Sequence, residues 1–419
     1  MTGVTRPRPG SRRRRVRPGP RSRGAAAACV SLAVAAAACT ATVTAPPAPA
    51  AGSVASVPLT AASTGTGAGW ATLAMGRLAD PLNTFWQLFY RSPHASTWQL
   101  DTPPGVASNG GLATSVSGSG TVLAGFGASL DLRFSPLAIS SDQGLSWTGG
   151  VLSWALARVP DSLAVSDTGQ ELALVAGGQQ VGPLGGTSGG VVSGSGGQAA
   201  WTGVVSTAAL AADPAASACR VRAITAVAYR PGGTGAVVGA LCARSGRVGI
   251  FEQDGGGGWV SVGPVLAGAA GTQVVRLEDT AAGLSALVRT GSGNAARLAA
   301  LWGSGAPGSA WTASGALTLG GAALRSTATT PTGGFVILTA GSHAGAGGRR
   351  SAAVADPASR AWQTLPAPPG DAASVVATPS GGFDALAPDG STLVVDSLAG
   401  GSWRRTQSID VPIQYGSSG

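Results

Sequence analysis

The sequence contains no lysine, and charged residues and aromatic residues are each scarce as a class. Charged residues make up 11% of the 419 residues and aromatic residues 5%, whereas hydrophobic residues reach 44%. A disordered chain has the opposite balance, with low hydrophobicity and high net charge. The composition therefore predicts a folded chain with an Ala/Val/Leu core, in which the 67 glycines mainly serve turns.

Residues that carry catalysis are also few. The two histidines, His94 and His343, lie in turn or loop segments, and neither accompanies a recognisable Ser or Cys nucleophile motif. The sequence contains no zinc-ligand spacing, Walker loop or dinucleotide fingerprint in a strand-to-helix setting. We therefore assign no catalytic residue, and we expect neither a metal nor a cofactor.

The formal net charge of +9 comes entirely from the N-terminal segment. Nine of the 27 arginines lie in residues 1–38, which leaves 27 − 9 = 18 arginines against the 18 acidic residues of the remainder. A protein that binds DNA or RNA through phosphates needs a basic surface. The remainder is formally neutral, so nucleic acid is not an expected partner.

Residues 1–38 have the organisation of an export signal, with an arginine-rich start followed by the apolar run Gly24–Ala38. The segment that ends in Ala36-Ala37-Ala38-Cys39 resembles a bacterial lipobox, and the all-arginine, Ala/Gly-rich usage is typical of a high-GC, actinobacterial-type source. The resemblance implies lipidation of Cys39, a membrane partner through the lipid anchor, and a location on the outer face of the cell membrane. Two alternatives to the lipid anchor remain open: cleavage after Ala50 with secretion, and an uncleaved anchor over residues 25–45. The export route, Sec or twin-arginine, also remains open.

Residues 39–66 are rich in Ala, Pro, Thr, Ser and Gly, which is the composition of a flexible tether. We expect the folded domain to occupy residues 67–419.

Tryptophan recurs along this domain at a nearly constant interval. Successive members of the series are 49, 54, 58, 52, 51 and 41 residues apart, which is the range typical of propellers and solenoids. Each lies next to a Gly- or Ser-rich turn. The members are Trp98, Trp147, Trp201, Trp259, Trp311, Trp362 and Trp403.

A second landmark, a glycine before a short apolar run, lies roughly twenty to thirty residues ahead of each tryptophan. Short Val/Leu/Ala/Phe runs between turn clusters predict strands, and two hairpins per repeat make a four-stranded antiparallel blade. We therefore predict an all-β, seven-bladed β-propeller, with residues 406–415 completing the blade that contains Trp70 and Trp98. The glycines are Gly69, Gly120, Gly169, Gly235, Gly283, Gly334 and Gly382.

One turn is specific enough to suggest a family. The segment from Ser140 through Asp142 and Gly144 to Trp147 resembles the Ser-x-Asp-x-Gly-x-x-Trp Asp-box of sialidase-like BNR propellers. Asp254, Gly256 and Trp259 keep the same spacing with Glu252 in place of Ser, and Asp356 with Trp362 and Asp396 with Trp403 are longer versions. The Asp carboxylate can accept backbone N–H bonds in a tight turn, and Gly can adopt the positive φ, so these residues are expected to be structural.

The resemblance implies a propeller whose substrate end lies away from the Asp-box turns. Sialidases also use an arginine triad, a Tyr nucleophile paired with Glu, and an acidic residue as acid/base. None of these roles can be transferred to a numbered residue here, and Arg133-Phe134-Ser135-Pro136 matches only loosely the arginine-bearing strand of the family. A sialidase-like glycoside hydrolase is therefore the alternative function.

The four cysteines fit an exported protein. Cys29 lies in the leader and Cys39 is the lipidation candidate, which leaves Cys219 and Cys242 on either side of the turn at Pro231-Gly232-Gly233. We expect these two to form a disulfide, because no nearby His or third Cys completes a metal or redox site.

These observations favour an exported cell-envelope lipoprotein that acts as a non-catalytic binding or scaffold module for a protein or glycan. Loops on a rigid scaffold are where binding residues concentrate. The segments 177–200 and 342–350, the latter with His343, Arg349 and Arg350, are the binding candidates. We expect the protein to be a monomer.

Overall fold

All described residues belong to the unit Ala48–Gly419. The predicted signal peptide, Cys39, Ala50, His343 and most of the two candidate binding segments lie outside them. The computed structural model describes residues 61–80, 83–103, 109–127, 134–152, 159–175, 189–196, 200–233, 235–244, 246–269, 271–341 and 349–413.

The described residues form an all-β structure, as predicted, in which four-stranded antiparallel groups follow one another along the chain. Within each group the strands pair in sequence order, so every connection is a hairpin. The early groups are β1 (Ala61–Ser63), β2 (Gly69–Gly76), β3 (Thr84–Arg91) and β4 (Gln99–Leu100); β5 (Gly111–Val116), β6 (Val122–Gly127), β7 (Ser135–Ser140) and β8 (Thr148–Leu152); and β9 (Ser162–Val165), β10 (Gln170–Val175), β11 (Gly190–Ser195) and β12 (Thr202–Ser206).

A short helix, α1 (Thr207–Ala212), and the 3-10 turn η3 (Pro214–Ala216) connect β12 to the next group. Ser206 caps α1 by accepting the N–H of Ala209 at 3.0 Å. The later groups are β13 (Val221–Tyr229), β14 (Ala236–Cys242), β15 (Gly249–Gln253) and β16 (Trp259–Ser261); β17 (Thr272–Thr280), β18 (Gly283–Thr290), β19 (Arg297–Gly303) and β20 (Thr312–Ala313), with η4 (Gly293–Ala295) and β21 (Leu317–Thr318); β22 (Ala323–Thr329), β23 (Phe335–Ala340), β24 (Arg350–Asp356) and β25 (Ala361–Thr364); and β26 (Ser374–Ala377), β27 (Phe383–Asp389), β28 (Thr392–Ala399) and β29 (Ser402–Asp410).

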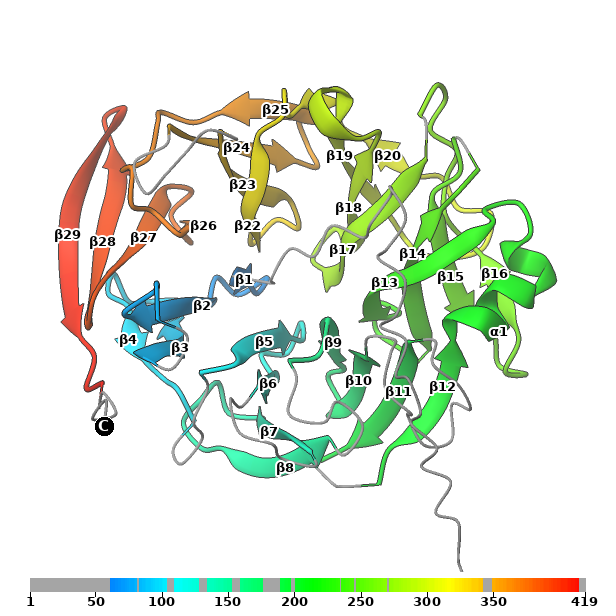
Figure 1. Ribbon diagram of the computed structural model, residues 1–419, viewed down its shortest axis with the longest axis horizontal. Coiled ribbons are helices and arrows are strands. Elements are labelled where there is room, and N and C mark those ends of the chain that lie inside the picture. Colours follow the sequence, from blue (N-terminus) through cyan, green and yellow to red (C-terminus); the bar gives the residue numbers. More distant parts are fainter. Residues whose placement is uncertain are drawn as a thin grey trace, which may run out of the picture. The chain divides into compact units, whose positions relative to one another are not determined.

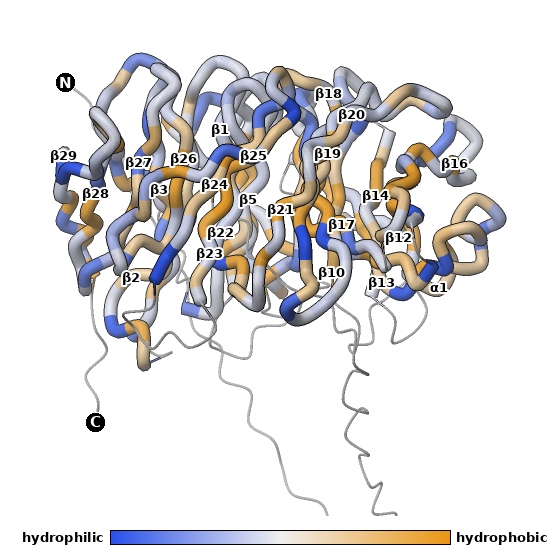
Figure 2. Tube along the Cα trace, turned by 90° about the horizontal axis from the view of Figure 1, so that it is seen from above, coloured by the Kyte–Doolittle hydropathy of each residue, from blue (hydrophilic) through white to orange (hydrophobic). Residues whose placement is uncertain are grey.

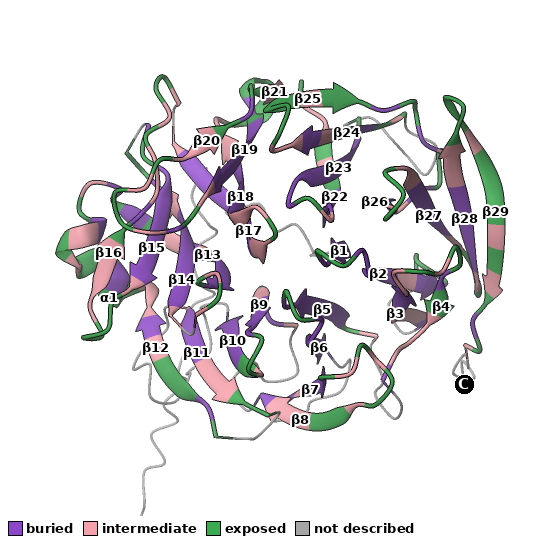
Figure 3. Cartoon of the chain, turned by 180° about the vertical axis from the view of Figure 1, so that it is seen from behind, coloured by how far each residue is buried: buried purple, intermediate pink, exposed green. Residues whose placement is uncertain are grey.

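The groups are arranged around a common centre, which the first strand of each group faces (Figure 1). This is the architecture of a β-propeller. Burial falls from the inner strands, which are mostly buried, to the outer strands such as β8, β25 and β29, which are largely exposed (Figure 3).

Hydrophobic side chains fill the spaces between neighbouring groups. One cluster, which includes Trp70 and Phe126, joins β1–β4 to β5–β8, and further clusters join each later pair. The cluster that contains Phe89, Val336 and Leu386 joins β22–β25, β26–β29 and β1–β4, so the apolar contacts run around the whole ring. In side view the hydrophobic segments lie along the strands between the turns (Figure 2).

Both sequence landmarks have fixed places in these groups. The glycine and apolar run correspond to the second strand, from β2 to β27. Each periodic tryptophan lies immediately before the fourth strand or within its first two residues. Several indoles then reach the preceding group: Trp201 Nε1 donates to the carbonyl of Val151 at 3.0 Å, and Trp311 Nε1 donates to that of Val262 at 2.6 Å.

The turn between the first and second strands is stabilised by a repeated hydroxyl contact. The side chain of a Ser or Thr accepts the backbone N–H four residues later, as Ser117 does from Thr121 at 3.1 Å and Thr378 from Gly382 at 2.9 Å. Thr64, Ser166 and Thr330 make the same contact. This contact is one physical reason why a Ser or Thr begins the turn before these five apolar runs.

The C-terminal strand does not complete the first group, so this expectation was wrong. β29 pairs antiparallel with β28 from Ala399↔Ser402 to Thr392↔Asp410, and the first group supplies its own four strands. Val411 continues beyond β29, donating to the carbonyl of Ser391 at 2.7 Å. The seam between β1–β4 and β26–β29 is therefore closed by side chains, by packing and by a backbone hydrogen bond from Gly76 to Gly390 of 2.7 Å, without a shared strand.

The expected boundary at residue 67 also needs correction, because Ala61–Ser63 already form the buried strand β1. This strand pairs with β2 and makes one parallel bridge to β22, at Ala61↔Ala328. The buried Arg276 of β17 donates to the carbonyl of Ala61 at 2.6 Å and to Thr327 Oγ1 of β22 at 3.2 Å. One guanidinium thus connects the inner strands of three groups.

Candidate functional site

The candidate site is a pocket at the seam between the first and last groups. Arg91 ends β3 and Asp384 lies in β27, 293 residues later in the chain. The Nη1 of Arg91 lies 2.6 Å from Asp384 Oδ2, and both side chains are almost fully buried. Arg91 Nη2 also donates to the carbonyl of Ala377 at 3.1 Å. The ion pair is therefore a fixed part of the seam.

Further donors hold the Asp384 carboxylate in place. Trp98 Nε1 donates to Oδ2 at 3.0 Å, and Ser397 Oγ donates to Oδ1 at 2.7 Å. The Arg91 guanidinium also lies over the Trp98 ring, 4.9 Å from its centroid. Burial lowers the pKa of Arg91, and the Asp384 carboxylate opposes that shift by its charge and hydrogen bond. Each charge of the pair is compensated within the pocket wall.

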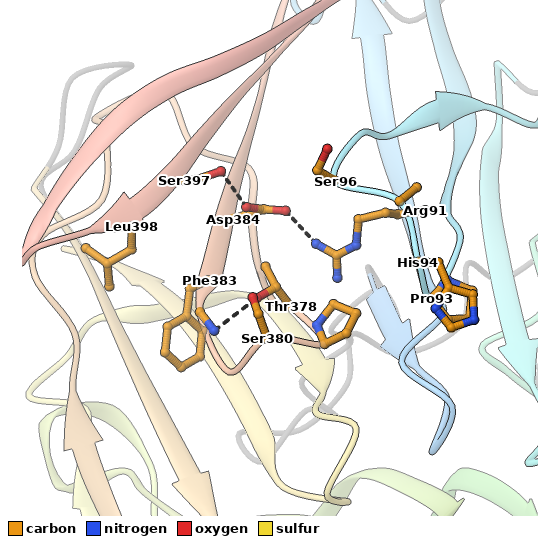
Figure 4. A pocket seen from close by; sticks show the side chains of 13 residues that line it. Arg91, Pro93, His94, Ser96, Thr378, Ser380, Phe383, Asp384, Ser397 and Leu398 are labelled. Carbon is orange, nitrogen blue, oxygen red and sulfur yellow. Dashed lines mark hydrogen bonds and ion pairs between the residues drawn. The ribbon is translucent and has the colours of Figure 1, made fainter.

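The pocket above this pair has a volume of about 380 Å³, within the range of about 300–1,000 Å³ usual for small-molecule sites. Arg91 and Asp384 point toward one another across one side, while Phe383 and Leu398 lie opposite Pro93 and His94 (Figure 4). Two turns supply most of the remaining lining. They are residues 93–96, between β3 and β4, and residues 378–382, between β26 and β27.

A smaller cavity of about 120 Å³ lies near the centre of the ring, lined by turns of β5–β6, β9–β10 and β13–β14. Tyr229, Asp167 and Asp279 contribute to its wall. Burial raises the pKa of Asp279 to about 6, with the charges of Asp167 and Glu278 adding to the shift. Burial and then Glu171 raise the pKa of Tyr229. The wall of this cavity is therefore acidic.

A sialidase-like reaction needs several arginines at the ring centre, and the described lining of this cavity includes none. The nearby Arg276 is buried and engaged, with Nε 3.1 Å from Glu278 Oε1. Burial lowers the pKa of Arg276 and raises that of Glu278, and each residue opposes the shift of the other. Arg133 and Tyr415 lie outside the described residues. The site chemistry of sialidases is thus not assembled in the described part of the centre.

The residues that resemble an Asp-box lie in the turn between β7 and β8. Ser146 donates to Asp142 Oδ1 from its backbone at 2.9 Å, and Ser140 Oγ donates to the same oxygen at 2.8 Å. Gly144 has a φ of +88° and donates its N–H to Ser140 Oγ at 2.8 Å. Trp147 is partly buried against the cluster of Trp70 and Tyr90.

The second turn with this spacing is organised in the same way. Asp254 Oδ1 accepts the N–H groups of Gly256 at 2.9 Å and Gly258 at 2.7 Å, and Trp259 begins β16. Asp396 differs, because it lies within β28, where its backbone is opposite that of Arg405 in the register with β29. The longer match at Asp396 and Trp403 is therefore not a turn carboxylate, and that expectation was wrong.

Both cavities lie at the end of the ring that carries the Asp-box turns. In an up-and-down group, the turns between strands one and two and between strands three and four share one end, and both cavities are lined by such turns. The resemblance placed the substrate site at the opposite end. The candidate segment 177–200 includes β11 (Gly190–Ser195), so it is not a loop throughout, and segment 342–350 includes the first residue of β24. The strands that precede these segments, β10 and β23, end at that opposite end.

Cys219 and Cys242 are joined in a disulfide with a Cα–Cα distance of 4.9 Å. Cys219 lies just before β13, and Cys242 is the last residue of β14, whose final two residues also pair with β17.

Within the described part of the chain, no group of three or more His, Cys, Asp or Glu side chains could hold a metal ion. The same residues include no helix of the length and hydropathy needed to cross a membrane.

Sequence reasoning missed Arg91 and Asp384 as site residues. Only Asp384 left a usable signal, because a lone carboxylate interrupts the apolar run from Phe383 to Leu386. No such signal marks Arg91. Proximity between residues so distant in the chain follows from the closed ring, which no local pattern specifies.

No family model and no curated protein sequence matches this chain. Solved structures with a similar fold include a proposed 6-phosphogluconolactonase from Bacteroides uniformis, at 14% identity, 82% and 97% coverage of the two chains and a TM-score of 0.46. The β-propeller domain of the Trilobed protease from Pyrococcus furiosus matches at 8% identity, 87% and 98% coverage and 0.46. YCF48 bound to a D1 peptide matches at 14% identity, 82% and 92% coverage and 0.43. At such low identity these likenesses concern the β-propeller fold and say nothing of function.

Proposed function

We propose that this chain is an exported, seven-bladed β-propeller with Asp-box turns that acts as a non-catalytic binding or scaffold module of the cell envelope. In this proposal residues 1–38 direct export, Cys39 carries the lipid, and the segment before β1 holds the propeller away from the membrane. The lipobox-like run before Cys39 and the basic, then apolar, leader support the anchor.

The observation that carries the binding role is the seam pocket. Its wall combines a fixed ion pair, hydroxyl groups and apolar side chains on a scaffold whose groups pack against one another around the ring. Rigid walls lower the ordering cost of binding. The charges of Arg91 and Asp384 are paired with each other. The wall is therefore suited to binding a ligand and not to catalysis. The partner is an envelope protein or glycan.

The anchor is tested by intact-mass analysis of membrane and culture fractions from cells that produce the full chain. A membrane-bound form that begins at diacylated Cys39, and that is lost in Cys39→Ala, is the expected result. A soluble, unlipidated form that begins near Ala51 would overturn the anchor and leave secretion as the route.

The binding role is tested by immobilising the full chain and passing over it separate polysaccharide and protein fractions of the envelope. We expect one fraction to be retained by the wild-type chain. Ser380→Arg, at an exposed position in the pocket wall, should reduce retention. Ser119→Arg is the matched control, because Ser119 occupies the equivalent turn of the β5–β8 group. Failure of the wild-type chain to retain either fraction would contradict the proposal.

A further inference from the structure

The two buried charges of the seam pocket are paired with each other, and of their polar atoms only Arg91 Nε lacks a hydrogen-bond partner among the described residues. Asp384 receives hydrogen bonds on both carboxylate oxygens, from Arg91 and Trp98 on one and from Ser397 on the other. Among the described lining residues, the only other ionisable side chain is His94, which is exposed at the rim. An anion would compete with Asp384 for Arg91, and a cation would compete with Arg91 for Asp384. An uncharged ligand avoids both costs.

The remaining wall is a mixture of hydroxyl groups and apolar surfaces. Hydroxyls can donate and accept hydrogen bonds, so they suit ligand hydroxyls, although Ser397 Oγ donates its proton to Asp384 Oδ1 and can therefore only accept from a ligand. The half-buried Phe383 ring and the neighbouring Leu398 provide an apolar surface on one side, with Pro93 on the other (Figure 4). The hydroxyl residues of the wall are Ser96, Thr378, Ser380 and Ser397.

The hydroxyl-bearing turn is held in a fixed conformation. Thr378 Oγ1 accepts the N–H of Gly382 at 2.9 Å and lies 2.9 Å from Ser380 Oγ. Ser397 Oγ lies 2.7 Å from Asp384 and 2.9 Å from Thr406 Oγ1. Preorganised polar groups beside an aromatic surface suit a ligand that has one apolar face and a rim of hydroxyls.

We propose that the seam pocket binds one uncharged sugar residue, with its C–H face against Phe383 and its hydroxyls toward the Ser and Thr side chains. The ligand class is a neutral carbohydrate, either free or as the terminal residue of an envelope glycan. This inference rests on the proposed binding function and gives that function a site and a ligand chemistry.

The test titrates the full chain in detergent with the methyl glycosides of glucose, galactose, mannose, arabinose and N-acetylglucosamine, with glucuronate and N-acetylneuraminate as anionic probes. Calorimetry and ligand-observed NMR supply the readouts. At least one neutral glycoside should bind, and the anionic probes should bind at least tenfold more weakly. Tighter binding of an anionic probe, or no binding of any neutral glycoside to folded protein, would overturn the inference.

Two substitutions locate the binding. Phe383→Ala should weaken binding at least tenfold, whereas Phe134→Ala, at a partly exposed phenylalanine of another group, should leave it unchanged. Should Phe383→Ala fail to fold, Ser380→Arg obstructs the pocket from an exposed turn, with Ser119→Arg as its control. Equal binding by wild type and the folded pocket variants would place the sugar elsewhere and overturn the inference.

Longer neutral oligosaccharides distinguish a free sugar from a glycan terminus. A glycan terminus predicts that a trisaccharide ending in the preferred sugar binds at least as tightly as its methyl glycoside, whereas a free-sugar site predicts weaker binding.

Capture of envelope fractions separates the sugar-site proposal from the proposed envelope function. Capture that Ser380→Arg reduces but the glycoside does not would refute the sugar site alone, and capture that neither reduces would refute the seam pocket as the binding site of either proposal. Absence of capture beside tight glycoside binding would refute the envelope role alone.

Discussion

The side chain of Gln407 pairs with both backbone groups of Trp98. The N–H of Trp98 donates to Gln407 Oε1 at 2.8 Å, and Gln407 Nε2 donates to the Trp98 carbonyl at 2.7 Å. Gln407 lies in β29 and Trp98 immediately before β4, so this amide joins the last group to the first. A primary amide presents the donor and acceptor that a neighbouring strand would otherwise supply. The ring therefore closes at this point without an exchanged strand.

Replacing Gln407 with Met should weaken this closure while keeping the length of the side chain. Since the backbone N–H and C=O of Trp98 would lose their partners, we expect a loss of about 1–3 kcal/mol in the free energy of unfolding. Urea denaturation followed by tryptophan fluorescence measures the change. Ser408→Ala on the exposed side of the same strand is the control and should be near neutral. Equal stability of Gln407→Met and wild type would show that this amide does not contribute to closing the seam.

The disulfide between Cys219 and Cys242 spans 23 residues. A crosslink of this span restricts the unfolded chain and stabilises the native state by about 3 kcal/mol. The double variant Cys219→Ser/Cys242→Ser should lose about that much in denaturant unfolding, and reduction of the wild type should give the same loss. Reductant should not affect the double variant. Free thiols at both positions in the protein isolated without reductant would contradict the prediction.

A substitution at Gly144 tests the packing of the turn that resembles an Asp-box. Its φ is +88°, and a Cβ there would lie 1.9 Å from Asp101 Oδ2. Gly144→Ala should therefore combine left-handed backbone strain with a clash, at a cost of about 2–4 kcal/mol in the free energy of unfolding. Gly169→Ala separates the two effects, because Gly169 has a φ of +75° with no atom within 4 Å of its would-be Cβ. Thermal and urea unfolding should give Gly169→Ala the smaller loss, and equal losses would refute the steric contribution.

Asp101 should make stability depend on pH. Burial raises the pKa of Asp101 from 3.8 to about 7 and the charge of Asp142 adds to the shift. The Trp147 indole acts in the other direction and lowers the pKa of Asp101, although its Nε1 makes no hydrogen bond of good geometry. Because the folded state favours the protonated acid, this contribution to stability is present below about pH 4 and declines as pH rises to about 7. Asp101→Asn should therefore raise the melting temperature relative to wild type at pH 8 but not at pH 4.

Asp142 should have the opposite pH dependence. Hydrogen bonds from Ser146, and then from Ser140, lower the pKa of this turn carboxylate. Its contribution is therefore present above pH 4 and is lost as pH falls. Asp142→Asn should lower the melting temperature at pH 8, with a smaller difference from wild type at pH 3. The two variants provide controls for each other: an increase in both at pH 8 would contradict the assignment of Asp142, and a decrease in both would contradict that of Asp101.

The sequence by itself determined the repeating hairpins. Periodic tryptophans mark the fourth strands, glycine and apolar runs mark the second, and hydroxyls cap the turns between the first and second strands, all through contacts a few residues apart. Local hydrogen bonding and strand propensity act over such short spans, so the pattern is visible in the chain. The all-β class followed from the same signals.

Only the tertiary structure decided how the ring closes and what the closure creates. Arg91 meets Asp384, Gln407 meets Trp98, and Arg276 connects β1 to β22 across hundreds of residues. Sequence reasoning assigned the last strand to the first group because strand exchange is a common closure, yet β28 offers β29 a full antiparallel register. The seam pocket follows from that choice, because contacts between chain ends depend on the summed geometry of the groups and not on any local pattern.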